Sequence, residues 1–305
     1  MNKKIINVLM ILLIFFCETA YARTIAFLRN DNEIWIYEEK DKKEQYICRG
    51  YDPRINPEGT YIAFTYKKET GSRYIAIVHI KGKSITLLES IPGNNNYGPQ
   101  WSFNGDTLAF SFWGKPAHNF FWNIGIFSPF ENAPFFILKK EGTDSLYSPT
   151  WSTQKDTVIC HDMYNVYEID MHGTITKKIP YAQLGGTDGI SSATHFILSK
   201  NGEYLIFDAE VQEFIGLPEP SSGIHVYDVK TKSTRCITSA KICALNPYWY
   251  SDSSIVFEGF TQNDIKHREG TDRYKINRRI YRIDITGKNL KVLIENAREP
   301  SVSNR

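Results

Sequence analysis

The sequence lacks most of the features that mark an enzyme or a nucleic-acid binder. It has no G-x-S-x-G element, no H-E-x-x-H element and no glycine-rich phosphate loop. No C-x-x-C pair occurs among its 5 cysteines, and its 7 histidines show no metal-ligand spacing. The formal net charge of +2 gives no electrostatic reason to expect nucleic acid or anionic lipid as a partner. These absences favour a binding protein over a catalyst, and we expect neither a cofactor nor a metal.

Long apolar runs are also lacking, except at the N-terminus. Two lysines precede the apolar run 5–16, and a short polar segment ends in Ala-Tyr-Ala at 20–22. The run is too short to span a bilayer, and the A-x-A pattern is typical of a cleavage site. We therefore predict a secretory signal peptide over 1–22, a periplasmic or secreted protein and no stable membrane insertion. The alternatives are an uncleaved membrane anchor and a lipoprotein modified at Cys17.

Four cysteines remain after the predicted cleavage, in a compartment where they can oxidise. Cys160 lies inside an apolar segment and is expected to be a buried thiol. Cys236 and Cys243 lie on either side of one connection, so the sequence leaves a disulfide between them open. Cys48 has no evident partner.

One pattern recurs along the whole chain, and GPQWSFNGDTLAFSF is its clearest copy. The copies begin at Asp52, Gly98, Ser148, Thr194 and Asn246, and an incomplete sixth begins at Glu299. Their proline positions, with Phe196 standing in for proline in the fourth copy, recur every 46 to 53 residues. The apolar residues alternate instead of following a helical period. A period near 50 residues built from short strands is the signature of a β-propeller blade.

Each period contains two further strands, which gives four per blade. The third strands of the blades begin near Glu33, Tyr74, Asn123, Asn165, Gly223 and Arg279. The chain after residue 22 opens with a second and a third strand, and it finishes with a first strand. We therefore predict an all-β, six-bladed β-propeller with four antiparallel strands per blade. Residues 23–305 form this single domain, and the N- and C-terminal strands together close one blade.

The repeat resembles the propeller repeat of the TolB family. Its carriers are Pro99, Trp101, Ser102, Gly105 and Phe110, followed by the strand Val166 to Asp170. The resemblance implies a six-bladed propeller that binds other proteins of the cell envelope through its propeller. TolB itself carries an α/β domain before the propeller, whereas here blade strands are expected directly after residue 22. A TolB-specific role therefore does not follow from the resemblance.

Propeller topology predicts which face carries function. The first strands begin at one face of the propeller, where the long connections also lie, and we call it the long-loop face. The hairpins that join first to second strands lie on the opposite face, which we call the short-turn face. Function on repeat scaffolds concentrates on loops held by a rigid frame. We therefore predict that the long-loop face and the channel mouth bind an envelope protein or peptide, and we expect a monomer. The candidate residues are Arg54, Gln100, Trp113, His118, Trp122, His161, Asp162, His195 and Tyr248.

Two groups among these candidates allow other interpretations. Trp113 and Trp122 flank a loop rich in aromatic residues, which either packs on its own blade or anchors a partner. His161, Asp162 and His195 are expected to approach one another at the channel mouth. Such a cluster leaves open the alternative function, a metal-dependent, lyase-like enzyme or carbohydrate-binding protein that acts on polysaccharide. The repeated tryptophans, in contrast, are expected to pack between blades.

Overall fold

The structure is a computed structural model that describes residues 23–113, 122–131, 135–138, 145–185, 189–213, 220–267 and 274–304. The predicted signal peptide at 1–22 and the candidate His118 lie outside the described residues. Within the described part of the chain, no helix has the length and apolar character needed to cross a bilayer. The only helical segments there are two short 3-10 turns, Tyr181–Leu184 and Gln262–Asp264.

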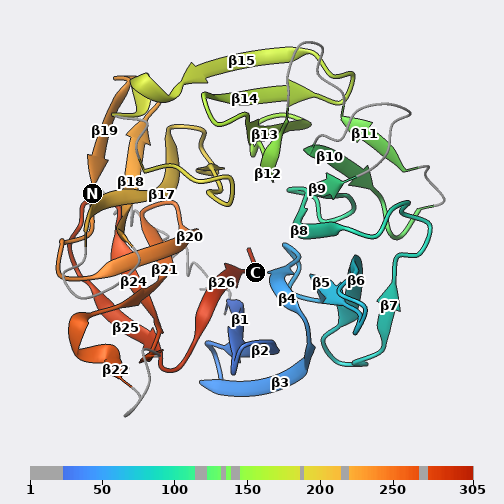
Figure 1. The fold of residues 1–305 in the computed structure, drawn as a ribbon, viewed down its shortest axis with the longest axis horizontal. Coiled ribbons are helices and arrows are strands. Elements are labelled where there is room, and N and C mark those ends of the chain that lie inside the picture. Colours follow the sequence, from blue (N-terminus) through green and yellow to red (C-terminus); the bar gives the residue numbers. More distant parts are fainter. Residues whose placement is uncertain are drawn as a thin grey trace, which may run out of the picture.

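Six four-stranded antiparallel sheets surround a central axis, with their first strands innermost (Figure 1). Blade 1 contains β26 (Arg298–Val302), β1 (Thr24–Arg29), β2 (Glu33–Glu38) and β3 (Lys43–Arg49). Blade 2 contains β4 (Tyr51–Ile55), β5 (Tyr61–Lys67), β6 (Arg73–His79) and β7 (Ile85–Leu87). Blade 3 contains β8 (Asn96–Trp101), β9 (Leu108–Trp113), β10 (Trp122–Phe127) and β11 (Phe136–Leu138).

The remaining three blades follow the same order. Blade 4 contains β12 (Tyr147–Trp151), β13 (Thr157–His161), β14 (Asn165–Asp170) and β15 (Ile175–Pro180). Blade 5 contains β16 (Ile197–Leu198), β17 (Tyr204–Glu213), β18 (Pro220–Asp228) and β19 (Ser233–Cys236). Blade 6 contains β20 (Cys243–Ser251), β21 (Ser254–Phe260), β24 (Arg279–Asp284) and β25 (Lys291–Ile294), with a separate hairpin of β22 (Ile265–His267) and β23 (Tyr274–Ile276). The predicted six-bladed, all-β fold is confirmed.

The two ends of the described chain close the ring through blade 1. Strand β26 pairs antiparallel with β1, so that Ala26 lies opposite Ser301. The backbone N–H of Thr24 donates to Ser303 Oγ at 3.0 Å. The N–H of Ser303 in turn donates to the carbonyl of Thr24 at 2.9 Å. The predicted closure by N- and C-terminal strands is therefore confirmed, and it leaves no first strand unpaired.

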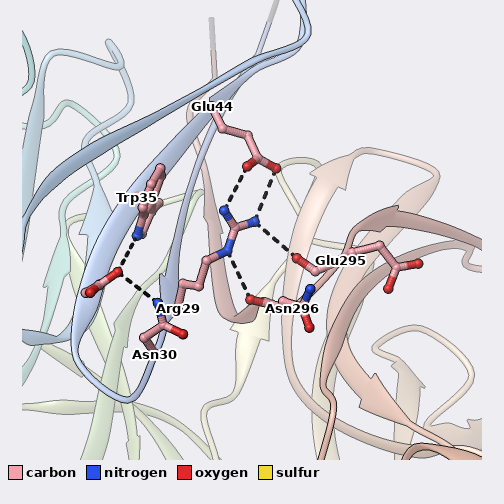
Figure 2. A network of polar contacts seen from close by, with 7 residues as sticks. Arg29, Asn30, Trp35, Glu44, Glu295 and Asn296 are labelled. Carbon is pink, nitrogen blue, oxygen red and sulfur yellow. Dashed lines mark hydrogen bonds and ion pairs between the residues drawn. The ribbon is translucent and has the colours of Figure 1, made fainter.

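A polar network fastens blade 1 to blade 6 on the long-loop face (Figure 2). Arg29, at the end of β1, forms a bidentate ion pair with Glu44, with nitrogen–oxygen distances of 2.8 and 3.3 Å. The same guanidinium donates to the backbone carbonyls of Glu295 at 3.1 Å and Asn296 at 3.2 Å. Both carbonyls belong to the connection between β25 and β26. The network therefore holds the end of β1 against the segment that connects β25 of blade 6 to β26 of blade 1.

The repeated tryptophans tie neighbouring blades together. The indole N–H of Trp101 donates to the Arg54 carbonyl of blade 2 at 2.9 Å. Trp151 donates in the same way to the carbonyl of Gln100 at 3.0 Å, and Trp249 donates to that of Ile197 at 3.0 Å. Buried indoles need such partners, because an unmade hydrogen bond in the core is costly. The expected packing role of these residues is confirmed.

A bulge accompanies the proline of each proline-bearing first strand. The residue before the proline has a positive φ at Asp52 (51°), Gly98 (64°), Ser148 (46°), Asn246 (51°) and Glu299 (52°). The pairing register shifts at the same points. Proline has no N–H to donate, so it fits where the ladder is interrupted. Blade 5, which has Phe196 in place of proline, keeps only a two-residue first strand.

None of the four cysteines of the described residues forms a disulfide. Cys160 is fully buried, as predicted, in the core shared by blades 3 and 4. Burial also raises the pKa of Cys48 to about 12. Cys236 is exposed and Cys243 is buried, and no disulfide joins them.

Candidate functional site

The innermost strands enclose an axial cavity of about 480 Å³. Its wall contains the C-terminal ends of the first strands and the turns that follow them, from all six blades. These turns include Pro57, Ser102, Thr153 and Ser251. They are the short hairpins between first and second strands, so the cavity opens on the short-turn face. A cavity built from every blade is a common place for propellers and other closed frames to bind a ligand.

The mouth of the axial cavity combines apolar and charged groups. Phe103 lies in the hairpin of blade 3 and keeps 46% of its surface exposed. Nearby, the ring of Phe130 stacks on Trp101 with centroids 5.8 Å apart, and Phe130 is itself 48% exposed. Two of the charged residues along the wall, Arg23 and Lys200, are cationic, and Asp252 is anionic. An exposed aromatic ring in the wall of a partly charged opening is suited to contact another polypeptide.

Deeper in the cavity lie residues that directly follow the proline positions. Gln100 and Tyr248 line the wall at this level. Gln100 is only 5% exposed, yet its amide nitrogen Nε2 has no hydrogen-bond partner. Arg54 occupies the equivalent position in the neighbouring blade, is 7% exposed, and leaves its Nε–H without an acceptor. Buried donors without acceptors are rare in folded proteins and call for an explanation.

The residues just before the prolines form the other half of the channel, toward the long-loop face. Most of their polar groups have protein partners. The Thr65 hydroxyl donates to Asp52 at 2.6 Å, and the Ser148 hydroxyl donates to the carbonyl of Ser192 at 2.7 Å. Asn246 Nδ2 donates to Glu258 Oε2 at 3.1 Å. These contacts connect strands and therefore stabilise the ring.

Glu258 is the centre of this half of the channel. Its side chain is 2% exposed and forms an ion pair with Arg278. Besides Asn246, it accepts a hydrogen bond from the backbone N–H of Glu299 at 3.1 Å. One carboxylate thus joins the first strands of blades 6 and 1 at the point where the ring closes. Such a satisfied buried carboxylate is structural, and removing it would leave several donors without acceptors.

Two further carboxyl groups in the channel have unusual protonation. Burial, reinforced by the negative charges of Asp52 and Glu258, raises the pKa of Glu299 to about 7. Burial is also the main reason that the pKa of Asp208 rises to about 7. Both groups are therefore partly protonated near neutral pH, which limits the repulsion among the channel carboxylates.

The structure brings His161 and His195 close enough to influence each other, as expected; His161 is buried and His195 is half-buried. His161 is fully buried, and its Nδ1 lies 2.5 Å from the Tyr181 hydroxyl. Burial lowers the pKa of His161 to about 4. Burial, together with the charges of Arg54 and His161, lowers the pKa of His195 to about 3. Both rings are thus neutral at physiological pH.

Asp162 does not complete a site with these histidines. Its carboxylate caps its own turn, accepting from the N–H groups of Tyr164 at 3.0 Å and Asn165 at 2.8 Å. It also accepts from the Tyr167 hydroxyl at 2.6 Å. Across the described ranges, no group of three or more His, Cys, Asp or Glu side chains is placed to hold a metal ion.

The aromatic candidates of the long-loop face pack on one another. Trp113 and Trp122 lie opposite each other on β9 and β10, with ring centroids 4.9 Å apart. Tyr97 contacts Trp122 edge-on at 5.2 Å, and the Arg73 guanidinium lies 4.3 Å from the centre of the Tyr97 ring. All of them come from blades 2 and 3. Partner binding at this face stays a prediction from the sequence.

The sequence analysis missed the short-turn end of the channel. Phe103, Lys200 and Arg23 line the axial cavity there, although none of them was a candidate. The hairpins after the first strands are short, and short turns gave no reason to expect a cavity. One feature of the sequence could have predicted this cavity. In a six-bladed propeller all six first strands lie around the axis, so their C-terminal ends surround a common space.

The sequence matches no known family and no curated protein. Solved structures do match its fold. TolB from Acinetobacter baumannii is 14% identical, with a TM-score of 0.63; the match covers 92% of this chain and 66% of that one. A putative TolB from Agrobacterium tumefaciens is also 14% identical, with a TM-score of 0.61 and 91% of each chain covered. A chain of the nidogen/laminin complex is 8% identical, with a TM-score of 0.61, covering 92% of this chain and 98% of that one.

The fold and these likenesses place the chain among the six-bladed β-propellers. More narrowly, its fold is similar to that of the TolB propellers, in agreement with the resemblance seen in the repeat pattern. The nidogen/laminin chain reaches a TM-score of 0.61, equal to that of the second TolB. Similarity at this level therefore shows the fold alone, and the function has to be argued from the site.

Proposed function

We propose that the protein is an exported, non-catalytic propeller that binds an envelope protein or peptide through its axial cavity. The observation that carries this proposal is the cavity of about 480 Å³ to which all six blades contribute. Its wall includes the exposed ring of Phe103 and the Gln100 amide, whose nitrogen the protein leaves unpaired. Export is proposed from the basic and apolar N-terminal segment.

The position of the cavity favours the short-turn face as the binding surface. Gln100 and Tyr248, which the sequence analysis also proposed as partner-binding residues, both lie on its wall. In the long-loop half, the carboxylates of Asp162 and Glu258 are occupied by partners within the protein. A partner gains more from groups that are unpaired in the free protein than from groups that already have partners.

Site-directed photo-crosslinking tests the proposal and the choice of face together. A photoreactive phenylalanine analogue replaces Phe103 on the short-turn face, or Tyr164 on the long-loop face, where Tyr164 is 75% exposed. The protein is irradiated in the envelope fraction of its source cells. We expect a discrete crosslinked species from position 103 and none from position 164. The opposite result would assign binding to the long-loop face, and no crosslink from either position would overturn the proposed function.

A further inference from the structure

Two buried hydrogen-bond donors without acceptors lie at the inner end of the axial cavity: Gln100 is part of its wall, and Arg54 lies behind the wall, next to Tyr248. Gln100 Nε2 and Arg54 Nε are both in side chains at least nine-tenths buried, and neither has an acceptor. They come from equivalent positions of adjacent first strands, since Arg54 pairs with Ala63 and Gln100 pairs with Ala109. The Trp101 indole fixes the spacing of these strands by donating to the Arg54 carbonyl at 2.9 Å.

Arg54 also lacks a carboxylate partner. Among the described residues it forms no ion pair, and its Nη1 donates only to the carbonyl of the adjacent Pro53, at 2.9 Å. Its charge acts on His195, Tyr248 and Glu299, which belong to three other blades. The guanidinium therefore lies near the axis, and Tyr248 connects it to the cavity wall. A buried, unpaired guanidinium is costly unless an anion approaches it.

We propose that Arg54 and Gln100 form a subsite for the terminal carboxylate of a peptide. A carboxylate has two oxygens, so it can accept from a guanidinium N–H and from an amide N–H at once. The wall of the cavity extends inward from the short-turn face as far as Gln100 and Tyr248. It includes none of the residues that precede the prolines of the first strands, such as Asp52 or Asn246. A linear chain that enters from the short-turn face therefore presents its end at this level. Tyr248 supplies a phenol beside the subsite.

The composition of the mouth favours a peptide over an acidic sugar. Phe103 exposes an apolar ring on the cavity wall, which suits a side chain next to a peptide terminus. Arg23 and Lys200 along the wall attract a negatively charged chain end, against a single opposing charge on Asp252. This inference rests on the proposed function and specifies the ligand chemistry of the same cavity.

Affinity-selection mass spectrometry tests the subsite. The purified protein is mixed with a pool of N-acetylated tripeptides that have free C-terminal carboxylates, and separately with the same pool amidated at the C-terminus. We expect retention of free-acid peptides and at least about tenfold weaker retention of their amides, because a charge-assisted hydrogen bond is lost. Digalacturonate serves as a third probe with the same anionic group on a sugar.

Three variants locate the effect. Arg54→Gln and Gln100→Leu should each weaken binding of the retained acids by about tenfold, and Arg54→Lys should restore only part, because lysine lacks the planar fork. Arg49→Gln, at an exposed arginine of β3, is the matched control and should leave binding unchanged. Thermal unfolding of each variant establishes that the fold is intact.

The possible outcomes separate the two proposals. Equal retention of acids and amides, in a protein that still crosslinks at position 103, would overturn the carboxylate subsite and leave the proposed function in place. Retention of digalacturonate alone would overturn the assignment to peptides. Failure to retain any probe, or binding unchanged by Arg54→Gln, would overturn the subsite as a whole.

Discussion

The two halves of the central channel differ in how their polar groups are used. Toward the long-loop face, Glu258 alone connects Asn246, Arg278 and the backbone of Glu299. Toward the short-turn face, Gln100 and Arg54 keep donors without acceptors. The residues before and after each proline lie two positions apart on the same first strand, and they belong to different halves. The comparison separates polar residues that serve ring closure from those that we propose to bind a ligand; His161 Nε2, toward the long-loop face, also has no hydrogen-bond partner and is neither.

The largest effect is expected in the half that stabilises the ring. Glu258→Gln removes the buried charge that balances Arg278 and weakens the contacts to blades 6 and 1. We expect the free energy of unfolding to fall by about 3 kcal/mol, measured by chemical denaturation. The control is Glu44→Gln, whose partner Arg29 lies in the exposed network of Figure 2 and whose loss should cost about 0.5 kcal/mol. Equal losses in the two variants would contradict a central role for Glu258.

A smaller effect concerns pH. Because the pKa of Glu299 is raised to about 7 in the folded protein, its contribution to stability is fully present below its unfolded pKa and is lost as the pH rises toward 7. The lowered pKa values of His161 and His195, about 4 and 3, act in the opposite sense: their contribution grows as the pH rises through the unfolded histidine pKa. The two trends partly cancel in the native protein.

Glu299→Gln removes the contribution of Glu299 to the pH dependence of stability and leaves that of the histidines. The variant should gain stability more steeply than the native protein between about pH 4 and 6.5, as followed by urea midpoints at several pH values. The neighbouring charges that set this behaviour are Asp52, Glu258, Arg298 and Arg54. Parallel profiles for the variant and the native protein would show that Glu299 titrates normally.

The smallest effect on stability is expected in the ligand-binding half. Gln100→Leu replaces an amide whose nitrogen lacks a partner by an apolar group of similar size, so the free energy of unfolding should change by less than about 1 kcal/mol. The same substitution should impair peptide binding. A large loss of stability in a denaturant titration would mean that Gln100 belongs with Glu258 as a structural residue.

The sequence predicted the fold because its signals are local. Alternating strands, turn residues and the recurring Pro-x-Trp each act within one blade, and their period gave the number of blades. The closure was predicted by combining the incomplete copies at the two ends. The degenerate fourth copy was also recognised, although its first strand shrinks to Ile197–Leu198. Every one of these signals lies within about 50 residues of chain.

The burial and the hydrogen-bond partners of the channel residues could not be predicted in the same way. Whether Gln100 keeps a free donor depends on strands that are distant in the sequence, such as β4 and β20. The capping role of Asp162 was predictable, since an aspartate three residues before an asparagine in a short turn commonly accepts from the following N–H groups. Burial of His161 requires the packing of blade 4 against Phe196 of blade 5, which no local pattern describes.

The C-terminal residues leave the ring beside the axial cavity, where Asn304 forms part of the wall. A purification tag fused there would be tethered at an effective concentration near the millimolar range. It would compete with any added peptide and mask weak affinities. An epitope inserted next to Tyr164, on the opposite face, would report on the same protein while leaving the entrance free.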